Sequence, residues 1–423
     1  MMQHHICYDI EMKKIRYFII MIILISGLAG GCGTSGKKAP AVQSSDTAAE
    51  NTTSLRDDAL WADPDSVTAM VVSDLHYTEV KGLDHSLVPG IALAEEIADA
   101  VFDEVVDRHP DVLIMTGDNT NTGDPADVSG LVSKLQRLKD EGIGIILTTG
   151  NHDFDLMDPE EFERAYFPLL DPVDRDPASL SYTSVVKEVV FLAMDDNAVY
   201  PGGQGEFPSA TMQWLEDMLV KYRDHRILFL SHHNVLYGYG KEDTASHLIQ
   251  NPELLSLLQK GGVRLALTGH MHFQYIVEKD GLWEILSGMP FSGRHLLGNL
   301  AVGPDRAVYY AEPIDFTTSD NAAGEELEAL DRENTAYMHE VFSALLEKEN
   351  LNGTKKEKVL DLIERFFLYY ADGTLMEHAQ ELQEDPSYKR MIDALWDYNY
   401  GPWMKEMIET TDHSAGKLEL IFD

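Results

Sequence analysis

Five short apolar segments of this chain are each followed by a polar block containing Asp, Asn or His, and this pattern constrains the fold more than any other feature. The blocks read SDLH, GDN, GNHD, SHHN and GHMH, in that order. The segments that precede them lie at 67–72, 112–115, 143–147, 227–230 and 264–267. Each segment is rich in aliphatic or β-branched residues, so each is predicted to be a buried strand.

The spacing between these segments predicts an α/β fold. Two further strand candidates cover 189–194 and 282–286, and helical apolar spacing occurs at 91–106 and 128–138. Strands that alternate with helices form sheets whose faces the helices cover, which suits segments that are apolar on both faces. Such sheets bind ligands at the carboxyl ends of their strands, so we expect the five polar blocks to converge.

The candidate ligands in the converging blocks supply oxygen and imidazole groups and no sulfur. The candidate metal ligands are Asp74, His76, Asp118, Asn151, His232, His270 and His272. This set suits manganese, iron or zinc in an open site and does not suit a structural zinc bound by thiolates. The pattern therefore predicts a metal centre at the shared edge of the strands.

In this order the blocks D-x-H, G-D, G-N-H-D, a His after a strand and G-H-x-H resemble those of the calcineurin-like metallophosphoesterases. The resemblance covers about 66–316 and implies a four-layer α/β/β/α sandwich at 65–317. It also implies two divalent or trivalent metal ions of manganese, iron or zinc. One ion would be held by Asp74, His76, Asp118 and His272, and the other by Asp118, Asn151, His232 and His270.

The fourth block leaves the choice between His232 and His233 open. The family ligand follows its strand directly, which favours His232, but Asn234 stands where the family often has Pro. His232 is the expected ligand.

The resemblance further implies catalytic roles for His152 and Asp153. His152 would protonate or polarise the leaving oxygen, and Asp153 would hydrogen-bond the other ring nitrogen of His152. Two cations would share a bridging hydroxide and hold the phosphoryl oxygens for in-line attack. Arg294 is the candidate for substrate binding through a phosphate contact. By contrast, the residues Asp195-Asp196-Asn197 are expected to form a solvated turn.

The N-terminus resembles that of an exported bacterial lipoprotein. A basic segment at 12–16 precedes an apolar run at 17–28, which is too short to span a bilayer and is typical of an export signal. The run ends in Leu28-Ala29-Gly30-Gly31-Cys32, which is similar to a lipobox and implies lipidation of Cys32. The alternatives are an ordinary cleaved signal and an uncleaved anchor. We expect a signal peptide at 1–32, with a true start at Met1 or Met12, a flexible tether at 33–64, and a protein anchored by lipid on the outer side of the cell membrane.

From about residue 318 helical periodicity replaces the strand pattern. Apolar residues share one helical face at 338–346 and another at 359–370, and a third helical segment covers 386–397. The sequence Thr354-Lys355-Lys356-Glu357 is a capping-box pattern that restarts a helix. We expect a helical C-terminal module at 318–423 packed on the catalytic domain.

The net charge of -39 opposes binding of a polymeric nucleic acid, whose phosphate backbone would be repelled. The order of tether, catalytic domain and helical tail is similar to that of lipoprotein-type bacterial phosphodiesterases that act on cyclic nucleotides. This likeness implies hydrolysis of small phosphodiesters. One alternative is a broad phosphomonoesterase. Another is a surface metal-binding adhesin without activity, although such a protein would have no use for His152 and Asp153, which are not ligands.

Overall fold

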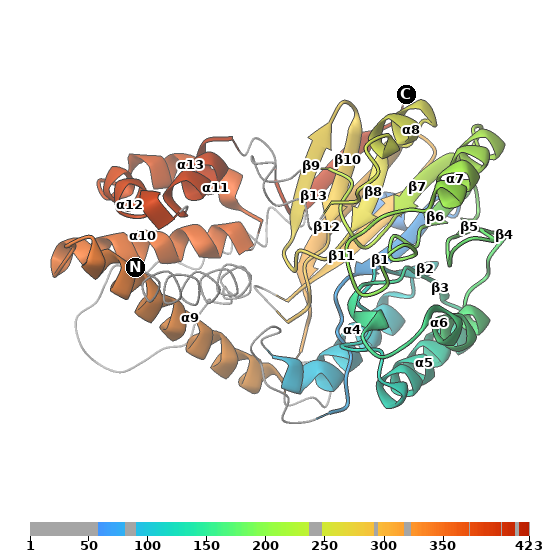
Figure 1. Ribbon diagram of the computed structural model, residues 1–423, viewed down its shortest axis with the longest axis horizontal. Coiled ribbons are helices and arrows are strands. Elements are labelled where there is room, and N and C mark those ends of the chain that lie inside the picture. The colour runs from blue at the N-terminus through green and yellow to red at the C-terminus, as the bar shows by residue number, and fades with distance from the viewer. Residues whose placement is uncertain are drawn as a thin grey trace, which may run out of the picture.

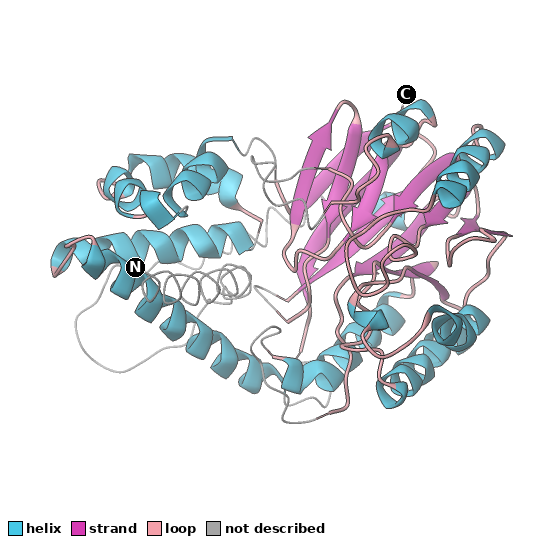
Figure 2. Cartoon of the chain, viewed as in Figure 1, coloured by secondary structure: helices cyan, strands magenta, loops and turns pink. Residues whose placement is uncertain are grey.

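The computed structural model describes residues 58–80, 90–236, 248–291, 295–316, 323–371, 373–398, 400–410 and 414–422. The predicted signal peptide, Cys32 and Arg294 lie outside the described residues. Within those residues, two β-sheets pack against each other with helices on their outer sides, and a separate group of helices lies beside them (Figures 1 and 2).

The first sheet has six strands in the order β13-β12-β11-β1-β2-β3. Their bounds are β1 (Val67–Val72), β2 (Val112–Met115), β3 (Gly144–Leu147), β11 (Leu296–Val302), β12 (Arg306–Pro313) and β13 (Lys417–Ile421). Strands β1, β2 and β3 are parallel, whereas β11, β12 and β13 join as antiparallel strands. Every residue of β1 is buried, as expected for a strand covered on both faces.

The second sheet has seven strands in the order β4-β5-β6-β7-β8-β10-β9. Their bounds are β4 (Asp174–Arg175), β5 (Tyr182–Val186), β6 (Val189–Ala193), β7 (Arg226–Leu230), β8 (Leu265–Thr268), β9 (Tyr275–Lys279) and β10 (Leu282–Leu286). The four strands β6, β7, β8 and β10 are parallel, so their carboxyl ends lie at one edge.

Helices cover the outer face of each sheet. On the first sheet lie α4 (Ala94–Arg108), α5 (Pro125–Asp140) and α6 (Pro159–Tyr166), and on the second lie α7 (Ser209–Lys221) and α8 (Leu254–Lys260) (Figure 1). Strand β6 shows how the layers form: Phe191 packs in the core that both sheets share, and its neighbour Leu192 packs with Leu215 of α7. The predicted four-layer α/β/β/α sandwich is confirmed.

All seven strand segments predicted from the sequence form strands, with ends displaced by at most one residue. The structure adds β4, β5, β9, β11, β12 and β13, which were not predicted. In β9 the apolar run is only three residues long and only Ile276 is buried, so its signal is weak. Residues 58–64 also differ from the tether expected at 33–64, because helix α3 (Asp58–Trp61) packs Leu60 against Ala301 and Val308.

The helical region follows β12 and contains α9 (Ala323–Lys348), α10 (Thr354–Ala371), α11 (Leu375–Glu384), α12 (Tyr388–Ala394), η5 (Trp396–Tyr398) and α13 (Tyr400–Thr410). Helix α10 begins at Thr354, where the capping-box pattern predicts a restart. The region has its own core, which also takes in Phe273 and Leu286 of the sandwich. None of the described helices combines the length and apolar character needed to cross a bilayer.

The chain does not stay helical to residue 423 as expected. After α13 it returns to the sandwich as β13, which pairs with β12 and places Leu418 and Leu420 in the sandwich core. The alternation of these two residues with exposed or half-buried ones is the period of a strand, and it is too short to stand out beside long helical patterns.

Tyr182 of the second sheet closes the free edge of β3 in the first. Its hydroxyl accepts from the Leu147 amide at 3.0 Å and donates to the Leu147 carbonyl at 3.0 Å. Both groups are buried, so without Tyr182 an amide and a carbonyl at the sheet edge would lose their partners.

We expect Tyr182→Phe to lower the free energy of unfolding by about 1–3 kcal/mol, because it leaves a buried amide and carbonyl unpaired. The matched control is Tyr166→Phe: the Tyr166 hydroxyl is also buried but has no hydrogen-bond partner among the described residues. That control should be neutral or slightly stabilising in the same urea unfolding experiment. Equal effects of the two substitutions would contradict the role given to Tyr182.

Candidate metal centre and active site

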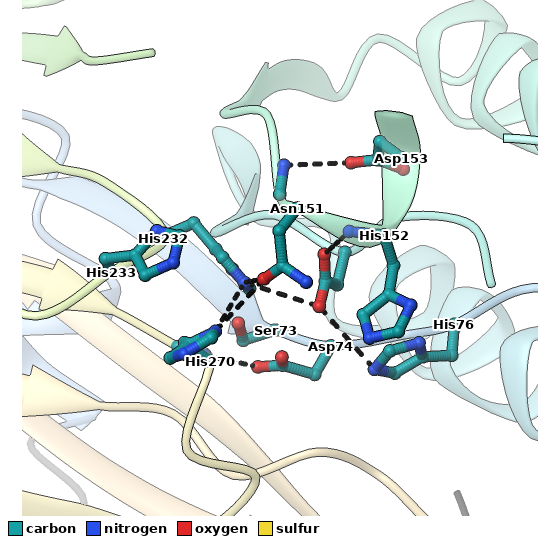
Figure 3. Close-up of polar contacts among 12 residues, drawn as sticks. Ser73, Asp74, His76, Asn151, His152, Asp153, His232, His233 and His270 are labelled. Atoms are coloured by element: carbon teal, nitrogen blue, oxygen red, sulfur yellow. Dashed lines mark hydrogen bonds and ion pairs between the residues drawn. The ribbon is translucent and has the colours of Figure 1, made fainter. Parts of the chain in front are cut away.

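Loops at the carboxyl ends of parallel strands bring the predicted residues together (Figure 3). The loops after β1, β2 and β3 come from the first sheet, and those after β7 and β8 from the second. They carry all seven predicted ligands, namely Asp74, His76, Asp118, Asn151, His232, His270 and His272. These residues form two adjoining sets.

The first cluster consists of Asp74, His76, Asp118 and His272. Each residue offers one ligand atom, and these atoms all lie within 4.8 Å of one another. The Nε2 atoms of His76 and His272 are 3.2 Å apart, and Nε2 of His272 lies 3.4 Å from Oδ1 of Asp74. This set matches the first ion site that the family resemblance implies.

The second cluster consists of Asn151, His232 and His270, with Asp118 beside them. Oδ1 of Asn151 lies 3.1 Å from Nε2 of His232 and 3.1 Å from Nδ1 of His270. Nε2 of His232 is 3.3 Å from Oδ2 of Asp118, which also lies 3.8 Å from Nε2 of His76. Asp118 therefore lies between the two clusters.

His232 rather than His233 belongs to the second cluster. Nδ1 of His232 donates to the Thr116 carbonyl at 2.9 Å, which directs Nε2 at Asn151 and Asp118. His233 points its Nδ1 at Asp196, 3.2 Å away. Nε2 of His232 thus lies beside Asn151 and Asp118, and its role as a metal ligand stays a prediction.

The backbone at these residues is strained. Five of the cluster residues have left-handed backbones, with φ values of 52° (Asp74), 40° (His76), 47° (Asp118), 70° (His270) and 62° (His272). Each such conformation costs about 1–3 kcal/mol in a residue with a side chain, and it persists where the surrounding structure imposes it. Strain concentrated in this way marks a functional site.

Two glycines allow the loops to approach closely. A Cβ atom on Gly150 would lie 1.9 Å from the Asp118 amide nitrogen, and a Cβ on Gly117 would lie 2.6 Å from the His232 ring. The G-D and G-N-H blocks therefore need glycine because their loops are in contact across the site.

The ionisable side chains of the two clusters are largely buried, and burial and their mutual contacts shift their pKa values. Burial raises the pKa of Asp118, but His232 and the other nearby imidazoles hold it well below its usual value. Burial lowers the pKa of His76 to about 3, so this ring is neutral, as a metal ligand must be. Burial also lowers the pKa of His232, yet the Asp118 carboxylate raises it to about 10, so these two residues attract each other strongly.

The residues present fit a cation in each cluster. The buried Oδ1 atom of Asp74 has no hydrogen-bond partner among the described residues. Imidazole nitrogens face each other at 3.2 Å in both clusters, where at most one of each pair can donate a proton. Ligands of a single cation, each about 2.1 Å from it, lie roughly 3–3.5 Å apart, so a shared cation accounts for this spacing.

His152 lies beside the first cluster and is partly exposed. Its ring centroid is 5.0 Å from that of His76, and its amide donates to Oδ1 of Asp118 at 2.7 Å. Nδ1 of His152 contacts Oδ2 of Asp155 at 3.2 Å. Burial lowers the pKa of His152, but Asp155 and Asp118 together raise it to about 9.

The role expected for Asp153 is wrong. Its carboxylate is fully buried and accepts from Asn119, Thr120 and Gly150, at distances between 2.8 and 3.3 Å. It joins the loop after β2 to the loop after β3 and does not orient His152. That contact belongs to Asp155, because the 3-10 helix η2 (His152–Phe154) brings residues three apart onto one side.

Two further groups support the site and were not identified from the sequence. The turn Asp195-Asp196-Asn197 is buried rather than solvated, and it contacts the loops that carry Asn151 and His232.

Glu284 of β10 accepts from the Val235 and Leu236 amides at 3.0 and 2.6 Å and fixes the chain that follows His233. A Glu inside the apolar strand LWEIL was the one available signal, since a carboxylate is buried only with partners. Burial raises the pKa of Glu284 to about 7.

We expect Asp153→Asn to lower the free energy of unfolding by about 2–4 kcal/mol, because an amide group would face donors that now share a carboxylate. Asp155→Asn should change stability by less than about 0.5 kcal/mol, since Asp155 is exposed and contacts one partly exposed imidazole. Urea unfolding of both variants measures the difference. A stable Asp153→Asn protein would refute the structural role of Asp153.

Comparison with known proteins identifies the family of this chain. The sequence profile of the calcineurin-like phosphoesterases matches residues 67–274. A Synechococcus protein named "Probable cyclic nucleotide phosphodiesterase" is 30% identical over 191 residues, which are 45% of this chain and 68% of that protein. A dimetal phosphatase from Danio rerio covers 59% of this chain and 96% of its own, with a TM-score of 0.47 and 14% identity. A purple acid phosphatase from yellow lupin covers 60% and 52%, with a TM-score of 0.41 and 13% identity. The predicted family is confirmed: the chain belongs to the calcineurin-like phosphoesterases.

Proposed function

We propose that this protein hydrolyses small phosphodiesters, such as cyclic nucleotides, with two metal ions. The observation that carries the proposal is the convergence of the first and second clusters on Asp118, which lies within 3.8 Å of an imidazole nitrogen in each. The first ion would be held by Asp74, His76, Asp118 and His272, and the second by Asp118, Asn151, His232 and His270.

Two bound cations would supply Lewis acidity to the phosphoryl oxygens and activate a water nucleophile. The protein's own residues would position the ions and the substrate and supply a proton. Asp118 sets the separation of the two sites through its position between the clusters. His152 stands beside them on the partly exposed side, where an incoming ester arrives, and can give a proton to the leaving oxygen. Asp155 keeps the His152 ring oriented and favours its protonated form.

The similarity to the Synechococcus protein supports a diester substrate, because that protein is named as a probable cyclic nucleotide phosphodiesterase. The eight residues formed by the two clusters and His152 include two carboxylates and neither Lys nor Arg, so the bound cations and His152 would supply the positive charge that attracts the phosphate.

We expect the purified full chain loaded with Mn²⁺ to hydrolyse bis(p-nitrophenyl) phosphate with a kcat/KM at least about tenfold above that for p-nitrophenyl phosphate. The two esters share a leaving group, so the ratio isolates the charge and shape of the phosphate. Removal of metal by a chelator should abolish both activities, and Mn²⁺ should restore them. Preference for the monoester would identify a phosphatase. No hydrolysis of either ester would favour a metal-binding adhesin.

We expect His152→Ala to reduce hydrolysis by about 10²–10⁴-fold for a diester with an alkyl leaving group, and by much less for the nitrophenyl ester. An alkoxide needs a proton to depart, whereas nitrophenolate does not. Metal content should be unchanged, and His225→Ala, at an exposed position away from the clusters, is the control. Equal losses for both leaving groups would show that His152 positions the substrate and does not donate a proton.

A further inference from the structure

The turn after β6 is buried and charged, although its sequence is typical of a solvated loop. Asp195, Asp196 and Asn197 are 4%, 0% and 0% exposed. Two carboxylates and an amide are kept from water only where many partners receive them. The partners show what this turn does.

One side of the turn holds the main chain at His232. Oδ2 of Asp196 accepts from the amides of His232 and His233 at 3.0 and 2.7 Å. Oδ1 of the same carboxylate accepts from Nδ2 of Asn197 at 2.9 Å and lies 3.2 Å from Nδ1 of His233. The carboxylate therefore sets the direction in which His232 leaves β7.

The other side of the turn holds the loop that carries Asn151. Oδ1 of Asp195 accepts from the Thr149 hydroxyl at 2.7 Å, and Oδ2 accepts from the Leu180 amide at 3.0 Å. Nδ2 of Asn197 approaches the Thr149 hydroxyl at 3.3 Å and the Thr149 carbonyl at 3.4 Å. Asn197 thus contacts Asp196 and Thr149 at once and links the two sheets.

We propose that Asp195-Asp196-Asn197 is the positioning element of the second cation site, and that Asp196 is its central residue. This inference rests on the proposed two-metal function. Asn151 and His232 come from different sheets and meet only in the second cluster, and the turn is hydrogen-bonded to both of their loops. The first cluster is held differently: the Asp74 amide donates to the Gly117 carbonyl and the His76 amide to the Asp118 carbonyl, at 3.1 and 2.9 Å. No described hydrogen bond joins the turn to Asp74 or His76.

The chemistry of position 196 requires a carboxylate. Both oxygens face donors, and two of these are backbone amides that cannot change role. In Asp196→Asn the side-chain oxygen can still accept from the two amides, but the new NH₂ group then faces Nδ2 of Asn197, another donor. Asp196→Ala leaves both backbone amides buried and unpaired. Asp196→Asn is therefore expected to weaken the turn less than Asp196→Ala does.

The test is a Mn²⁺ titration of the full chain followed by electron paramagnetic resonance, which counts bound ions and separates a spin-coupled pair from a single ion. Wild type is expected to bind two ions and show the coupled signal. Asp196→Ala should keep the first ion, lose affinity for the second by about 10–100-fold, and lose the coupled signal. Asp196→Asn should lose about tenfold for the second ion, and it decides the question if the Ala variant does not fold.

The matched control is Asp111→Ala. Asp111 precedes β2 and accepts from the Thr68 amide and hydroxyl and from Lys187, so its loss removes a carboxylate that joins two strands at the end opposite both clusters. This control should keep both ions. Unchanged binding in a folded Asp196 variant would overturn the proposal, as would equal weakening of both ions or the same second-ion loss in Asp111→Ala.

The proposed function is judged separately by ester hydrolysis in the same wild-type preparation. Two bound ions without hydrolysis would contradict the function and leave the role of the turn intact. Fewer than two ions in wild type would overturn the role of the turn as well, because there would be no second site to position.

Discussion

The buried carboxylate of Asp118 is the interaction on which the geometry of the site depends. Oδ1 of Asp118 accepts the His152 amide at 2.7 Å, while Oδ2 faces His232 at 3.3 Å and His76 at 3.8 Å. It thereby joins loops from three different strands across two sheets. A buried charge is tolerated only when neighbours compensate for it, so the surrounding imidazoles and amides have to be held in fixed positions. Much of the architecture described above serves that requirement.

The sandwich provides the rigidity that such a site needs. Left-handed backbones at Asp74, His76 and Asp118 would relax in a mobile loop, but here each follows a fully buried strand end. Around them lies a layer of buried acidic side chains that contact main-chain amides rather than the reacting groups: Asp153 between β2 and β3, Asp196 behind His232, and Glu284 behind the loop after β7. Precision at the centre therefore depends on carboxylates that are not themselves ligands.

The seven strands β1, β2, β3, β6, β7, β8 and β10 and the ligand-bearing blocks could be predicted because both are local signals: an apolar run and the residues directly after it. Features set by tertiary contact could not. The turn 195–197 has the composition of a solvated loop, and only its contacts with Thr149 and His232 exclude water from it. Asp153 was given the wrong partner because adjacency in the chain does not fix side-chain direction, and the tight helical turn at His152–Phe154 presents Asp155 instead. Strand β13 was missed because its pairing partner, β12, lies across the whole helical region.

That last strand changes how the helical region is attached. The chain leaves the first sheet at β12 and re-enters it at β13, so the helices form a long excursion whose two ends are adjacent strands. A cut made just after β12 would remove more than the helices. It would uncover the amide and carbonyl groups of β12 that now pair with β13, and it would expose apolar side chains that Leu418 and Leu420 now cover. The sandwich and its helices are thus one folding unit by connectivity. A shortened protein would expose an unpaired strand edge at which other protein molecules could associate.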